Sequence, residues 1–151
     1  MPALDTTCQK TARNYAQNAA SYCCAAHTLL AGKDELAVDL VMAFYLLIGF
    51  SVELSLKSLC LSAGMTLKEV TDFRHKLPDA LNAVAVRRID PRLSFVTDVH
   101  RIIDALAPMH ADPNTMRYTK ADIEFLQMPP SVPCAGVALF LTELAEGLAW
   151  R

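Results

Sequence analysis

Apolar residues recur along most of the chain at alternating steps of three and four, which is the spacing of one face of an α-helix. In the first such segment the stripe consists of Cys8, Ala12, Tyr15, Ala19, Tyr22, Ala26 and Leu29. Glycine, proline and capping residues separate the segments. The pattern predicts helices over residues 7–30, 35–63, 78–88, 90–108 and 131–148, with short helical turns after residue 66 and over 120–127.

The segment 35–63 differs from the others because its middle is apolar on every side, with no charged residue over 41–50. A helix without a polar face is normally buried. We therefore expect it at the centre of an all-α fold, an antiparallel up-and-down bundle of four long helices plus one or two short ones. Small polar residues on this helix suggest a close-packing surface for a neighbour: Ser51, Ser55, Ser58 and Ser62.

The length predicts that residues 1–151 form a single domain, and the composition provides ample apolar surface to bury. Hydrophobic residues make up 53% and charged residues 20%, which excludes intrinsic disorder. The net charge of −2 lacks the overall basicity of most nucleic-acid binders, so any such contact requires a local patch. Arg87, Arg88 and Arg92 concentrate positive charge at one corner that could hold phosphate, although such residues more often complement a helix C-terminus.

The sequence predicts a cytoplasmic protein without a membrane span. The first ten residues lack the pattern of a signal peptide, and the longest strongly apolar uncharged stretch, 40–52, has 13 residues where a span needs about 20. The five cysteines contain no C-x-x-C and are expected to be reduced. Cys23, Cys24 and His27 place thiols and an imidazole about one turn apart, but a metal needs further ligands. We expect no metal and no cofactor.

Glu53 and Lys57 stand out because they occupy an otherwise apolar stripe of the central helix. A glutamate four residues before a lysine is the favoured orientation for an ion pair on a helix. A buried charge needs partners, since desolvating an isolated charge costs several kcal/mol. The pair is therefore expected to be largely buried, either as a structural ion pair only or as part of a polar pocket that binds a ligand.

Two later segments could supply further partners for such a pocket. His75 precedes the predicted helix over 78–88, and Arg117 and Tyr118 follow the predicted helix over 90–108. Each also has a purely structural interpretation, because a loop histidine can bind a backbone carbonyl and a tyrosine at the edge of a core needs a partner for its hydroxyl. The candidate binding residues are thus Glu53, Lys57, His75, Arg117 and Tyr118.

The same residues carry a resemblance to a known family. Residues 51–59 are S-V-E-L-S-L-K-S-L, residues 75–77 are H-K-L before a helix, and an arginine-tyrosine step follows at 117–118. This combination resembles the HEPN-like helical domains of prokaryotes, in which E-L-x-L-K, H-x-L and R-Y elements occur. The resemblance implies an up-and-down helical bundle, frequent homodimers, and a role around toxin–antitoxin, phage-defence or nucleotidyltransferase-associated systems.

Catalytic members of that superfamily are metal-independent RNases with an arginine, four to six intervening residues and a histidine. The arginine would stabilise charge on the reacting phosphate, and the histidine would move a proton near neutral pH. Here Arg92 and His100 have seven intervening residues, and Arg101 and His110 have eight. The RNase site therefore does not carry over, and both histidines can instead cap or edge the fourth helix.

Three functions remain open. We prefer a non-catalytic, homodimeric module that binds a partner protein, an RNA or a small ligand through the pocket of Glu53. The alternatives are an RNase that uses a displaced arginine-histidine pair, and a purely structural helical protein. The last helix is the first candidate for the dimer seam, because Leu139, Phe140 and Trp150 lie off its expected inward stripe of Val137, Leu141, Leu144 and Leu148.

Overall fold

The structure is a computed structural model that describes residues 5–31, 36–95, 97–111 and 129–151. Its elements are α1 (Thr6–Leu30), the 3-10 turn η1 (Val38–Leu40), α2 (Val41–Ser62), α3 (Leu67–Asp72), α4 (Leu77–Val86), α5 (Arg92–Phe95), α6 (Thr97–His110) and α8 (Ser131–Ala149). The described residues contain no strand. The prediction of an all-α helical bundle is therefore confirmed.

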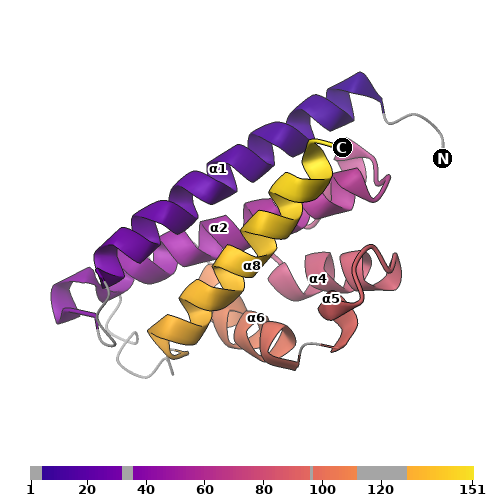
Figure 1. The fold of residues 1–151 in the computed structure, drawn as a ribbon. Coiled ribbons are helices and arrows are strands. Elements are labelled where there is room, and N and C mark those ends of the chain that lie inside the picture. The colour runs from indigo at the N-terminus through magenta and orange to yellow at the C-terminus, as the bar shows by residue number, and fades with distance from the viewer. Residues whose placement is uncertain (1–4, 32–35, 96, 112–128) are drawn as a thin grey trace.

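The helix α2 lies at the centre of the bundle, as its apolar middle predicts. It runs antiparallel to α1, and α8 lies across these two helices (Figure 1). On the other side, α4 and α6 pack against α2 and against each other. Because neighbours cover α2 from several directions, residues all around it are buried, among them Phe44, Ile48, Val52 and Leu59.

Small side chains allow α1 and α8 to approach α2 closely. The buried stripe of α1 is Ala12, Ala16, Ala19, Cys23, Ala26 and Leu30. Ser51 and Ser58 of α2 donate hydrogen bonds to the carbonyl oxygens of Ala19 and Ala12, at 2.9 and 2.8 Å. Ser55 faces Thr142 of α8, with 3.3 Å between the hydroxyl oxygens. Ser51, Ser55 and Ser58 are therefore packing sites, as predicted, whereas Ser62 is only half-buried.

The predicted inward stripes of α1 and α8 need correction. At several positions an alanine faces the core where the sequence predicted a larger neighbouring residue. On α1, Tyr22 is exposed and Tyr15 only half-buried, while Ala16 is fully buried. On α8, Leu144 and Leu148 are half-buried, and Ala145 and Ala149 take the inward positions. The reason is steric, since helices that pack closely place their smallest residues at the contact and their larger ones beside it.

Helix boundaries agree with the local signals, with three exceptions, and the first is that the segment predicted as one helix over 90–108 forms two helices, α5 and α6. Thr66 and Glu69 form the capping box that begins α3, and Asp90 caps the chain before α5. However, α2 begins at Val41 after a 3-10 turn rather than at residue 35, and α6 continues through Pro108 to its end. The last turn of α6 is retained because the two residues after the exposed proline are buried.

Among the residues that the structure describes, two helices are long and apolar enough to cross a membrane by length and composition, α2 and α8. In α2, 72% of the most apolar 18-residue segment is buried inside the bundle. Packing against the neighbouring helices therefore accounts for its apolar character. For α8 the buried share is 44%. Its exposed apolar residues are Val132 and Leu139, with Trp150 directly after the helix.

Candidate functional site around Glu53

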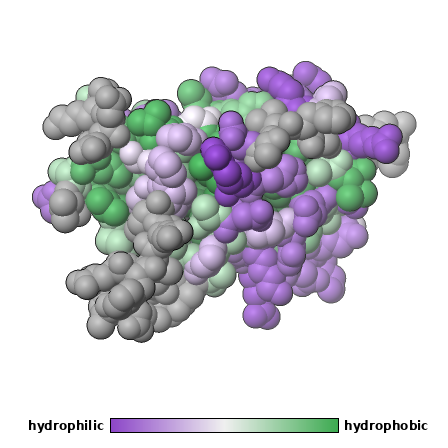
Figure 2. Space-filling view, turned by 90° about the horizontal axis from the view of Figure 1, so that it is seen from below, coloured by the Kyte–Doolittle hydropathy of each residue, from purple (hydrophilic) through white to green (hydrophobic). Residues whose placement is uncertain are grey.

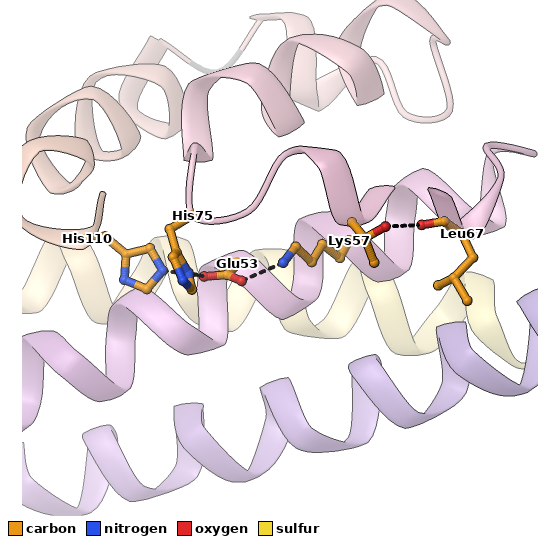
Figure 3. Close-up of polar contacts among 6 residues, drawn as sticks. Glu53, Lys57, Leu67, His75 and His110 are labelled. Carbon is orange, nitrogen blue, oxygen red and sulfur yellow. Dashed lines mark hydrogen bonds and ion pairs between the residues drawn. The ribbon is translucent and has the colours of Figure 1, made fainter. Parts of the chain in front are cut away.

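Glu53 lies in the middle of α2 and is only 6% exposed. Its Oε1 atom accepts a hydrogen bond from Lys57 Nζ at 2.6 Å. Its Oε2 atom lies 2.9 Å from His75 Nδ1 and 2.5 Å from His110 Nε2. Figure 3 shows the lysine on one side of the carboxylate and both imidazole rings on the other. We call these four residues the Glu53 cluster.

The turn between α3 and α4 directs His75 toward α2. Arg74 adopts a left-handed conformation with φ of 51°, which reverses the chain direction after α3. The Lys76 amide then donates to the Phe73 carbonyl at 2.9 Å, and Leu77 is buried at the start of α4. Because both sides of this short turn are anchored, the imidazole between them is held against Glu53.

His110 reaches Glu53 from the last turn of α6 and is 3% exposed. Its ring occupies the space beside Gly49, where a Cβ atom would lie 2.4 Å from His110 Nδ1. The Phe50 and His75 rings stand nearly perpendicular to the His110 ring and complete its surroundings, with ring centroids 5.3 and 5.7 Å away. A glycine is therefore required one turn before Glu53 for this histidine to enter the core.

The surroundings of Glu53 keep its carboxyl group ionised. Burial alone would raise its pKa, but the hydrogen bonds from His110, His75 and Lys57 outweigh burial and lower the pKa to about 2. Among the described residues, no buried side-chain nitrogen or oxygen lacks a hydrogen-bond partner. The cluster is thus satisfied by its own members, and His75, whose side chain is 39% exposed, connects it to solvent.

The structure confirms the predicted burial and pairing of Glu53 with Lys57, whose side chains are 7% and 12% exposed. It also brings the candidate His75 into the same cluster. Arg117 and Tyr118 lie outside the described residues. The sequence-based assignment missed His110 as a partner of Glu53. A glycine inside an apolar helix, here Gly49, is the one sequence signal of such a close approach.

The residues of the alternative RNase pairs are each engaged with a different neighbour. Arg101 is exposed, whereas His110 is buried in the Glu53 cluster. The His100 ring is bound to a backbone carbonyl oxygen at 2.9 Å. The contacts are Arg92 with Asp90, His100 with the Leu93 carbonyl, Arg101 with Asp98, and His110 with Glu53. No arginine-histidine contact is formed within either pair among these described side chains.

The thiols and imidazole on α1 do not assemble a metal site either. His27 Nε2 lies 3.1 Å from the Ala135 carbonyl oxygen. Cys23 is buried and Cys24 exposed. In the part of the chain that the structure describes, three potential ligand atoms instead converge in the Glu53 cluster, within 4.8 Å of one another.

Comparison of the chain with protein-family models, with curated proteins and with solved structures gave no match.

Proposed function

We propose that this chain is a non-catalytic, homodimeric helical module that binds RNA through the surface of α3, α4 and the turn between them. The module would act in the cytoplasm, as expected from the sequence. The resemblance to HEPN-like domains supports this proposal and adds toxin–antitoxin, defence or nucleotidyltransferase-associated systems as its setting. The contacts and charges of the described residues supply the physical argument.

The observation that carries the proposal is a local excess of positive charge. Residues 66–92 contain six lysines and arginines against four aspartates and glutamates, in a chain whose net charge is −2. Two of the six cations pair with aspartates. The other four are exposed and form no ion pair with any described residue: Arg74, Lys76, Arg87 and Arg88.

These cations lie at the two ends of α4, a helix of ten residues and hence about 15 Å long. Hydrophilic side chains dominate the right half of the view in Figure 2, which is the side of the molecule where α4 lies in Figure 1. Arg74 and Lys76 flank His75, which the cluster ties to the core. A fixed turn loses little conformational entropy on binding, so it suits contacts with successive phosphates.

RNA binding without cleavage is consistent with the contacts of the two alternative RNase pairs, because among the described residues no arginine in them contacts its histidine. Arg92 and His100 hold different partners, and the bidentate ion pair of Arg92 with Asp90 leaves that guanidinium less available for phosphate. We therefore expect intact RNA after prolonged incubation with the purified chain, and the same RNA pattern with a His100→Ala, His110→Ala double variant. RNA degradation by wild type alone, without added metal, would favour the RNase alternative instead.

Fluorescence anisotropy with a labelled single-stranded RNA tests the binding itself. Affinity should fall with salt, with a slope of about 0.7 in log affinity per log salt for each phosphate contacted. The double variant Arg74→Ala, Lys76→Ala should lower this slope by about 1.4. The variant Lys10→Ala, Arg101→Ala makes the same change in net charge on other helices and should bind like wild type. Equal losses in the two variants, or no binding at low salt, would refute the proposal.

A further inference from the structure

The Glu53 cluster contains a ligand set that is common at protein metal centres. Glu53 Oε2, His75 Nδ1 and His110 Nε2 all lie within 4.8 Å of one another. Two imidazoles and one carboxylate bind Zn²⁺ and non-haem Fe²⁺ in many proteins. Figure 3 shows the two rings directed at the same carboxylate. We propose that these three residues bind one divalent first-row transition-metal ion, with Zn²⁺ as the best-suited species.

The present distances need only small changes to admit the ion. Ligand atoms about 2.0 to 2.1 Å from a tetrahedral Zn²⁺ lie about 3.3 Å from one another. The carboxylate oxygen now lies 2.5 Å from the His110 nitrogen and 2.9 Å from the His75 nitrogen. Each of these two pairs must therefore separate by less than about 1 Å, while the two ring nitrogens, which lie within 4.8 Å of one another, must end about 3.3 Å apart. The ion replaces two hydrogen bonds, and the proton of each coordinating nitrogen moves to the other ring nitrogen or to solvent.

The mixture of fixed and adjustable ligands favours this change. Glu53 and His110 belong to regular helices and are buried. His75 belongs to a turn, and its side chain is 39% exposed. The exposed side gives the ion an entry path and leaves room for water as a further ligand. A zinc site with three protein ligands keeps its fourth position open for water, unlike structural sites, which are closed by four protein ligands.

Lys57 has a defined role beside such a site. It holds Oε1 of Glu53 at 2.6 Å, so that Oε2 remains for the ion and the carboxylate plane is fixed. The cluster offers a single carboxylate, whereas Ca²⁺ requires many oxygen ligands and Mg²⁺ is also held mainly by oxygen. The expected selectivity is therefore for Zn²⁺, Co²⁺ or Ni²⁺ over Mg²⁺ and Ca²⁺.

Titration of the chelator-treated full chain with ZnCl₂ tests the site, and it is independent of RNA binding. Calorimetry should give one ion per chain, with affinity falling at acid pH because protons compete for the imidazoles. The chain has four histidines. In NMR spectra of their rings, Zn²⁺ should shift His75 and His110 and leave His27 and His100 unchanged. An absence of saturable binding, or shifts at His27 instead, would overturn the proposal without any variant.

A pair of histidine variants provides the matched control. His75→Gln retains a side-chain N–H for Glu53 but removes a metal ligand, and it should weaken Zn²⁺ binding at least about tenfold, since even partners outside the ligand set cost that much. His100→Gln removes a histidine that binds only a backbone carbonyl in the structure and should bind Zn²⁺ like wild type. Equal affinity of His75→Gln and wild type would show that the ion binds elsewhere.

Discussion

Substitution of Gly49 by alanine should displace His110 from the core. The added Cβ atom would lie 2.4 Å from Nδ1, 3.1 Å from Cε1 and 3.2 Å from Cγ of that ring. Because ordinary contacts are about 3.5 to 4.0 Å long, the ring must move by about 1 Å. The rings of Phe50 and His75 and the carboxylate of Glu53 surround it, so this movement breaks the 2.5 Å hydrogen bond to Glu53.

The expected magnitude follows from three contributions. Alanine gains about 1 kcal/mol over glycine in a helix interior. Overpacking of a core costs about 1 to 3 kcal/mol, and losing a hydrogen bond to a charged group costs about 1.5 to 3 kcal/mol. The free energy of unfolding of Gly49→Ala should therefore fall by about 1.5 to 5 kcal/mol.

Urea unfolding followed by circular dichroism measures this loss. Gly147→Ala is the matched control, because an added Cβ there meets nothing within 4 Å, and it should stabilise the chain by up to about 1 kcal/mol. In a His110→Ala background the clash is removed, so Gly49→Ala should become neutral or stabilising. If Gly49→Ala behaves like Gly147→Ala in the wild-type background, His110 does not occupy this space and the description of the cluster is wrong.

Three further outcomes follow from the same contacts. Lys57→Met should lower the free energy of unfolding by about 3 kcal/mol, because a buried carboxylate loses its lysine; an unchanged urea midpoint would contradict this. The lowered pKa of Glu53 gives stability that is present above pH 4.5 and lost as the pH falls toward 2, about 3 kcal/mol in all. Glu53→Gln should lose less stability over that interval in acid titrations, and an equal loss would exclude Glu53 as the source. Light scattering should give a dimer mass, twice 16.6 kDa, and Leu139→Glu on the exposed face of α8 should shift the mass toward the monomer value; a wild-type mass of 16.6 kDa would exclude the dimer.

The sequence by itself determined the features that depend on residues close together in the chain. Helical periodicity, the capping box at Thr66 and the proline in the first turn of α4 specify where helices form. The apolar middle of α2 specifies that this helix is central. Glu53 and Lys57 lie one helical turn apart, so their pairing is also a local property.

Only the tertiary structure decided which distant side chains meet Glu53. His110 lies 57 residues further along the chain, and its approach depends on how α6 packs against α2 and on the space beside Gly49. The same holds for the stripes of α1 and α8, where spacing identifies apolar positions but not whether alanine or a larger neighbour faces the partner helix. The physical reason is that periodicity records one helix at a time, whereas the distance between two helices depends on the side chains of both.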